Sequence, residues 1–298
     1  MTVKKTALAL VGTLMAGTLL LLTAACGTGD GGSGDGGDTT TTGRQDGKIT
    51  HPSGAEEIVL QVITGGGFVP IEYHLTLLPE FTLYGDGTVI VPGPMITIYP
   101  GPALPNLQTT KVSEDVVQAL LSAAKEAGLF SNGVDYGSPG VADVPSTSIV
   151  INAQGTTYRT DIYALGFEDG GGLTLEQQQA RAAINAFRGK LSTLAFTSGE
   201  LTWTPYDFTA LAVFARAIDP GYTPDPTDVQ PNHLTWPLAD LATSGTEVMQ
   251  PFRKIVVTGD ELTKLKPLLA QATQITIWES EGKQYMLAFR PLLPGEKE

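Results

Sequence analysis

Three pairs of β-branched segments, each joined by a short glycine-containing turn, constrain the fold of this 298-residue chain more than any other feature. Val, Ile, Thr and aromatic residues favour strands, and a turn that ends in Gly lets the chain reverse between two antiparallel strands. The three segments are 81–91 around Gly85-Asp86-Gly87, 148–160 around Gln154-Gly155, and 273–289 around Glu281-Gly282. The sequence therefore predicts antiparallel sheets built from β-hairpins.

Further strands are predicted at 58–63, which Gly65-Gly66-Gly67 ends, and at 255–257. Residues 208–216 alternate loosely between apolar and polar side chains, so they favour a strand, with a short helix as the alternative. Residues 219–237 hold five of the 20 prolines and predict an irregular loop.

Two amphipathic helices are predicted between these strands. Ser113 is placed to cap the first helix, which Gly128 ends. Thr174 and Gln177 have the capping-box spacing at the start of the second helix. Apolar residues recur at helical spacing in both, as Val117, Leu120, Leu121 and Ala124 in the first and Ala180, Ile184, Phe187, Leu191 and Leu194 in the second.

A third helix is predicted after Thr258 and Glu261, which again have capping-box spacing, and a kink or restart is expected at Pro267. Gln118 and Lys264 lie off the apolar stripes of their helices and are predicted to be exposed. The apolar stripe of the third helix is formed by Leu262, Leu265, Leu268 and Leu269.

These elements predict an α+β fold, in which antiparallel sheets of β-hairpins pack against amphipathic helices. We expect two α+β units, an N-terminal one at 50–197 and a C-terminal one at 198–298. A helix followed by a hairpin occurs at 113–160 and again at 259–289. This order suggests two similar helix–hairpin halves, although the residues match poorly and coincidence is the alternative.

The N-terminus has the organisation of an export signal. Lys4 and Lys5 precede an apolar run at 7–22, which is followed by Thr23-Ala24-Ala25-Cys26. The run is shorter than the roughly 20 apolar residues of a membrane-spanning helix. This segment resembles the signal peptide of a bacterial lipoprotein. The resemblance implies that 1–25 is removed and that lipid, including palmitate, is attached to Cys26. A plain secreted protein and an uncleaved anchor are the alternatives.

Residues 26–49 are predicted to be the lipidated Cys and a flexible tether rich in Gly, Asp and Thr. Nine of the 22 residues at 27–48 are Gly, and none is a large apolar residue. Such a segment buries too little surface to offset the entropy lost on ordering. Residues 27–32 match G-x-G-x-x-G, but neither a strand nor a helix is expected beside them, so we predict no dinucleotide site there.

The charge of the chain limits its partners. The formal net charge is −13, and loss of Lys4 and Lys5 with the signal would make it −15. Nucleic-acid binding requires clustered Lys and Arg, so we expect no nucleic acid. Anionic lipid head groups would repel the chain, so we expect membrane contact through the N-terminal lipid. The remaining partner is predicted to be an unknown protein or envelope ligand.

Residues that carry chemistry are sparse. His51, His74 and His233 stand alone, in none of the spacings typical of zinc sites, so no metal and no cofactor are expected. The S-x-x-K motif at 122–125 lacks the other motifs of penicillin-recognising enzymes, and G-x-S-x-G is absent. Three aspartates flank the second hairpin and are expected to serve turns and caps: Asp135, Asp143 and Asp161.

Several short motifs resemble uncharacterised exported proteins of actinobacterial type. The resemblance implies no known activity, and no catalytic residue can be transferred from it. The motifs are Tyr163-Ala164-Leu165-Gly166, Gln179-Ala180-Arg181, Trp236-Pro237-Leu238, Val256-Val257-Thr258-Gly259, Thr276-Ile277-Trp278 and the Arg-Pro-Leu-Leu-Pro-Gly-Glu run at 290–296.

The sequence favours a non-enzymatic binding or interaction module at the outer face of the cell membrane. A cell-envelope hydrolase that uses a pair of carboxylates is the main alternative, and an inhibitor or assembly factor is another. Trp203, Trp236 and Trp278 could belong to a recognition surface, but core packing is the favoured role.

Overall fold

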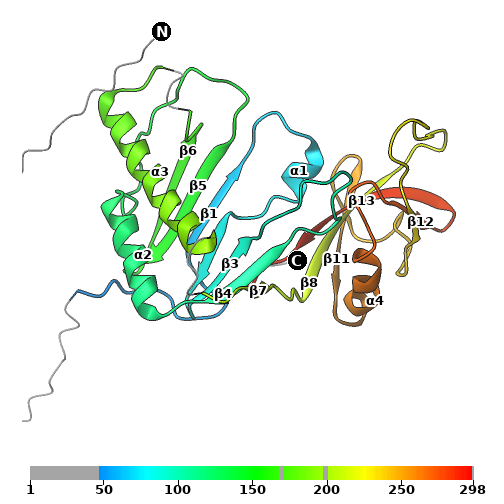
Figure 1. Ribbon diagram of the computed structural model, residues 1–298, viewed down its shortest axis with the longest axis horizontal. Coiled ribbons are helices and arrows are strands. Elements are labelled where there is room, and N and C mark those ends of the chain that lie inside the picture. Colours follow the sequence, from blue (N-terminus) through cyan, green and yellow to red (C-terminus); the bar gives the residue numbers. More distant parts are fainter. Residues whose placement is uncertain (1–46, 168–170, 197–200, 297–298) are drawn as a thin grey trace, which may run out of the picture. The chain divides into compact units, whose positions relative to one another are not determined.

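The computed structural model describes residues 47–167, 171–196 and 201–296. The expected signal peptide at 1–25, Cys26, most of the expected tether, and the expected unit boundary at 197/198 lie outside the described residues. Within the described part, two sheets dominated by antiparallel pairs are accompanied by four helices (Figure 1). This arrangement confirms the α+β fold class. No helix among the described residues is long and apolar enough to cross a bilayer.

The first sheet has seven strands in the order β6-β5-β1-β2-β3-β4-β7, all paired antiparallel. Two of the expected hairpins are present in it, as β2–β3 and β5–β6. The strands are β1 (Ile58–Gly65), β2 (Phe81–Tyr84), β3 (Thr88–Pro92), β4 (Leu107–Lys111), β5 (Ser146–Ala153), β6 (Thr156–Tyr163) and β7 (Thr204–Pro205).

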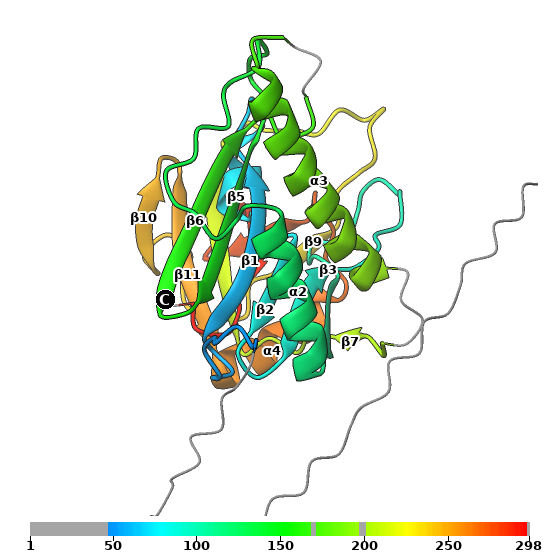
Figure 2. The same ribbon diagram turned by 90° about the vertical axis from the view of Figure 1, so that its left-hand side faces the viewer.

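One face of this sheet is covered by α2 (Glu114–Glu126) and α3 (Leu175–Phe196), as Figures 1 and 2 show. Because side chains alternate along a strand, Val89 and Val91 of β3 join the core under these helices, whereas Ile90 points to the opposite face. The predicted apolar stripe of α2 is buried, and so are Ile184, Phe187 and Leu191 of α3.

The helix starts follow the predicted capping rules. The Ser113 hydroxyl accepts a hydrogen bond from the Val116 N–H at 3.4 Å. Thr174 and Gln177 form the reciprocal capping box. The Thr174 hydroxyl accepts from the Gln177 N–H at 3.2 Å, and the Gln177 side-chain oxygen accepts from the Thr174 N–H at 3.0 Å. Gly128 follows α2 at φ +82°, where a side chain would be strained.

Gln118 is not the exposed residue that the sequence predicted. Its side-chain amide accepts from the Ile49 N–H at 2.8 Å and donates to the Ile49 carbonyl at 2.9 Å. Ile49 itself is buried in the first core, although the sequence analysis counted it as the last residue of the tether. These two bonds fix the backbone of Ile49 to α2, so Ile49 belongs to the folded part and not to the tether.

The second sheet has six strands in the order β10-β11-β8-β13-β12-β9. Only β9 and β12 pair in parallel, and α4 (Gly259–Leu269) packs on one face. The strands are β8 (Ala210–Ala217), β9 (His233–Thr235), β10 (Thr246–Met249), β11 (Phe252–Thr258), β12 (Ile277–Ser280) and β13 (Lys283–Pro291).

Several predictions for this sheet need correction. The strand expected at 208–216 is β8, which excludes the helix alternative, but the expected loop at 219–237 contains β9. The third hairpin begins at Ile277 because 273–276 form a turn. Thr258 occupies the N-cap of α4 without a side-chain cap bond, so that capping box is wrong. Pro267 lies in the last turn of α4, which continues without a restart to Leu269.

The expected helix–hairpin repeat is not confirmed. After α2, the first strand of the hairpin, β5, pairs with the central strand β1 and leaves β6 at the edge. After α4, the second strand of the hairpin, β13, pairs with β8 and leaves β12 on the outer side. The two hairpins therefore enter their sheets through opposite strands, although both follow a helix.

The two sheets are joined by side chains from both. Helix α1 (Ile71–Leu75), which lies between β1 and β2, packs Ile71 and Leu75 against Ala212 and Phe214 of the second sheet. In return, Leu293 after β13 packs against the back of the first sheet.

Arg290 of β13 fixes this junction. It donates to the Leu77 carbonyl at 2.9 Å and makes a two-bond ion pair with Glu296, at 2.7 and 2.6 Å. Tyr206 donates to the Leu292 carbonyl at 3.1 Å beside it.

One side chain covers part of the exposed edge of β6, at Thr157 and Arg159. The Asn132 amide donates to the Thr157 carbonyl at 3.3 Å and accepts from the Arg159 N–H at 2.8 Å. These bonds occupy backbone groups that an added strand would use, so Asn132 protects this edge from pairing with another chain.

Candidate functional site

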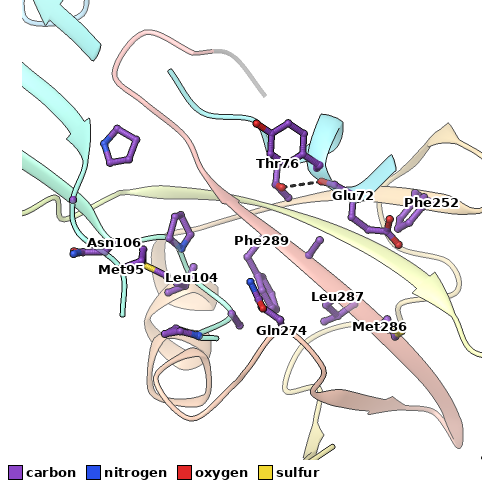
Figure 3. Close-up of a pocket in the computed structure, with 17 residues that line it drawn as sticks. Glu72, Thr76, Met95, Leu104, Asn106, Phe252, Gln274, Met286, Leu287 and Phe289 are labelled. Carbon is purple, nitrogen blue, oxygen red and sulfur yellow. Dashed lines mark hydrogen bonds between the residues drawn. The ribbon is translucent and has the colours of Figure 1, made fainter. Parts of the chain in front are cut away.

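A pocket of about 440 Å³ lies beside β13 at the junction of the two sheets (Figure 3). Its volume falls in the range of small-ligand sites. Three parts of the chain form most of its wall: α1, the 92–106 loop between β3 and β4, and the middle of β13. The lining residues are Glu72, Tyr73, Thr76, Pro92, Gly93, Met95, Pro102, Ala103, Leu104, Pro105, Asn106, Phe252, Gln274, Met286, Leu287, Ala288 and Phe289.

Asn106 fixes the conformation of the 92–106 loop, which forms one wall of the pocket. Its carbonyl accepts from the Gly93 N–H at 2.6 Å, and its side chain donates to the Pro94 carbonyl at 2.7 Å. The Gln108 side chain in turn donates to the Asn106 side-chain oxygen at 2.6 Å. These bonds close the base of the loop and place Met95 and Leu104 on the side of the pocket opposite β13 (Figure 3).

The polar groups of the pocket are few. Glu72 is its one carboxylate, and its Oε1 lies 3.6 Å from Nη2 of Arg216. Thr76 donates to the Glu72 carbonyl at 2.8 Å, while the Gln274 side chain makes no hydrogen bond to another described residue. The site is therefore apolar with one charged group at its edge, a composition typical of sites that bind apolar molecules.

Apolar residues continue from the pocket onto the surface. Met95 is followed in the same loop by Ile96, Ile98 and Tyr99, of which Ile96 is 72% exposed. Tyr73 of α1, which also lines the pocket, is 49% exposed. Contiguous exposed apolar surface of this kind is common at interaction sites.

No sequence motif predicted this site. The available signal was the Met-Ile-Thr-Ile-Tyr run at 95–99, apolar yet enclosed by Pro94 and Pro100. Proline at both ends disfavours a central strand, so apolar residues between them have no sheet to enter. The β13 residues that line the pocket show no comparable sequence signal, because their pattern is that of an ordinary buried strand.

The histidines do not come together. His51 contacts Glu114 at 3.2 Å, His233 contacts Glu279 at 3.3 Å, and His74 is exposed on α1. Over the described ranges, no group of three His, Cys, Asp or Glu side chains could hold a metal ion. Ser122 and Lys125 are exposed on α2.

The aspartates near the second hairpin mostly serve turns. Asp135 accepts from the Gly137 N–H at 2.8 Å and from the Gln177 side chain at 3.2 Å. Asp143 adopts φ +58°, and its carbonyl accepts from the Phe68 N–H at 3.2 Å. Asp161 is exposed on β6 and occupies no turn.

The favoured core role of tryptophan is confirmed for two of the three residues. Trp236 and Trp278 are buried and meet edge to face, with ring centroids 5.9 Å apart. Trp203 is partly buried against the first core. Among the exposed aromatic residues are Phe68, Tyr73 and Tyr99 of the 66–73 and 93–100 segments.

No pair of carboxylates lines any of five pockets found on the described residues, each of which has at most one. Burial would raise the pKa of Asp86, but hydrogen bonds from Thr88 and Lys111 outweigh this effect and lower it. Burial would likewise raise the pKa of Glu114, but hydrogen bonds from Gln118 and His51 lower it. Neither group is tuned as a proton donor at neutral pH.

No protein-family model matches the sequence, and no curated protein and no solved structure shows detectable similarity to it.

Proposed function

We propose that this chain is an extracytoplasmic protein, anchored to the cell membrane by lipid on Cys26, whose folded part is a binding module. The proposed ligand site is the pocket beside β13. The observation that carries the proposal is the pocket itself: about 440 Å³ of mainly apolar wall that continues onto exposed apolar residues of the 93–100 loop. The anchor rests on the resemblance of 1–26 to lipoprotein signals.

A carboxylate-pair hydrolase is less well supported. Such an enzyme needs two acidic side chains that flank one substrate, and the pocket offers Glu72 alone. Glu72 is also engaged in an ion pair with Arg216, at 3.6 Å.

Ligand binding is tested with N-phenyl-1-naphthylamine, an uncharged dye that fluoresces in apolar surroundings. The full-length chain is placed in lipid nanodiscs and titrated with the dye. Ala288→Trp fills the pocket, and Met95→Asp puts a charge at its exposed side without removing a core contact. Ala183→Trp, on the exposed face of α3, is the matched control for the added Trp side chain. Empty nanodiscs give the signal of dye dissolved in lipid, which is subtracted. We expect saturable binding in the parent and in Ala183→Trp that both pocket variants lose. Equal signals in all four proteins would refute the pocket as the ligand site.

The anchor is tested by Cys26→Ser, which removes the thiol that lipidation requires. We expect the variant to lose the lipid mass and to leave the detergent phase, or to persist as an uncleaved precursor. An unchanged mass and unchanged detergent partitioning would rule out the lipid anchor.

A further inference from the structure

Strand β13 has a partner on one side only along its second half. Its outer neighbour β12 pairs with it from Ile277↔Met286 to Ser280↔Lys283 and no further. The chain leaves the ladder at Thr276, whose N–H bonds to the Thr273 carbonyl at 3.1 Å instead. On its other side β13 is paired with β8 as far as Pro291.

The pairing register determines which backbone N–H and C=O groups of β13 have no partner beyond the end of β12. The hairpin turn is Glu281-Gly282, with φ values of +47° and +73°, so the flanking Ser280 and Lys283 form a hydrogen-bonded pair. Bonding direction alternates along a strand, so odd-numbered residues of β13 direct their N–H and C=O groups away from β8.

Bonds on the β8 side agree with this parity. The Ile218 N–H bonds to the Gln284 carbonyl at 2.8 Å, and the Leu292 N–H bonds to the Ala210 carbonyl at 3.0 Å. Even-numbered residues therefore face β8. Leu287 and Phe289 direct their backbone groups outward. The pairing of Ile277 with Met286 sets the Leu287 N–H against the Thr276 carbonyl. The Leu287 carbonyl and both backbone groups of Phe289 have no bond to another described residue.

These open groups border the pocket. Leu287, Ala288 and Phe289 line it, and Figure 3 shows Met95 and Leu104 on the opposite side. The pocket thus combines apolar walls with a short open strand edge. The edge of β6, in contrast, is partly covered by Asn132.

We propose that the pocket binds an extended apolar peptide segment, which adds to β13 as a strand and pairs with the backbone of Leu287 and Phe289. This inference rests on the proposed function and specifies its ligand class. Three peptide residues span the open edge at about 3.3 Å per residue, and up to about three main-chain hydrogen bonds form. Main-chain pairing supplies affinity, while the apolar walls select the side chains.

Electrostatics further restricts which residues the peptide carries. The one carboxylate of the lining, Glu72, is paired with Arg216 at 3.6 Å, so the charge preference comes from the whole chain, whose formal net charge is −13. An acidic segment would be repelled from the site, whereas basic residues on either side of an apolar centre would be attracted to it. The peptide is therefore apolar in its centre and neutral or basic at its ends.

The test uses the full-length chain in nanodiscs and a synthetic peptide, acetyl-Lys-Val-Ile-Val-Lys-amide. The matched control peptide carries N-methyl groups on its three central residues, which keeps the side chains and removes the backbone donors. Binding is measured by fluorescence anisotropy of labelled peptides, and hydrogen exchange is measured at single-residue resolution.

In the free protein, the amide of Phe289 should exchange faster than those of Met286 and Ala288. The parent peptide should slow exchange at Phe289, and N-methylation should weaken binding by about tenfold or more. Equal affinity for the two peptides, or no protection at the Phe289 amide, would overturn the strand-addition inference. Dye binding lost by the pocket variants would still support the proposed function in that case, so the two ideas fail separately.

Discussion

Replacing Arg290 by Met removes its ion pair with Glu296 and its bond to the Leu77 carbonyl, which links β13 to the segment between α1 and β2. Only 16% of the Arg290 side chain and 28% of the Glu296 side chain is exposed, so the pair is poorly screened by water. The substitution removes three donated hydrogen bonds and leaves the Glu296 carboxylate without its cation. Breaking a buried pair typically costs 3–5 kcal/mol, and the partial exposure reduces this to about 2–4 kcal/mol here.

Lys111→Met is the matched control, since it also replaces the cation of an ion pair by Met. Lys111 pairs with Asp86 at 3.1 Å, but its side chain is 66% exposed. We expect a loss of about 0.5 kcal/mol or less for this variant. Urea unfolding monitored by tryptophan fluorescence gives both free energies. If Arg290→Met and Lys111→Met proved equally mild, the junction would not depend on this pair. A double variant with Glu296→Gln should recover part of the loss, because it removes the unpaired charge.

Three further outcomes are expected. Burial and the Glu296 carboxylate raise the pKa of Tyr84, and burial raises the pKa of Tyr206 to about 12, so both stay protonated in the folded chain at pH values where an unfolded tyrosine ionises. The free energy of unfolding should therefore fall as the pH rises from about 10 to about 12. Tyr84→Phe should reduce this fall but change stability little at pH 7, because the Tyr84 hydroxyl makes no hydrogen bond in the described structure. An unchanged alkaline slope in the variant would contradict this. Gln118→Ala should cost about 1–3 kcal/mol in urea unfolding, because it removes both bonds that hold Ile49, so a neutral result would show that the N-terminal contact contributes nothing. Leu265→Ala should cost about 2–5 kcal/mol because Leu265 is fully buried, whereas exposed Lys264→Ala should stay within roughly 0.5 kcal/mol, and comparable losses would mean that α4 does not pack through this stripe.

Local features of the fold could be predicted from the sequence. The capping box of Thr174 and Gln177 and the turn at Glu281-Gly282 depend on residues a few positions apart, so the pattern contains all the information that forms them. The same holds for the buried stripe of α2, which follows from helical spacing alone.

Features that depend on a distant partner could not be predicted. Strand β9 forms because it pairs with β12, where Leu234 lies beside Trp278. No pattern in the Pro-rich segment around β9 predicts this pairing. Gln118 is fixed by Ile49, which precedes it by 69 residues. The candidate site has the same origin, since its walls come from α1, the 92–106 loop and β13 and meet only after both sheets have formed.

The order in which strands pair bears on how fast this chain folds. The β2–β3 and β12–β13 hairpins join neighbours in sequence, and such units close within microseconds. The central pairings are different, because Leu60 meets Ile151 and Val213 meets Phe289. Bringing such distant segments together costs loop-closure entropy before any packing compensates for it. Folding times in the range of milliseconds to seconds, typical of chains with high contact order, are therefore expected despite the fast local hairpins.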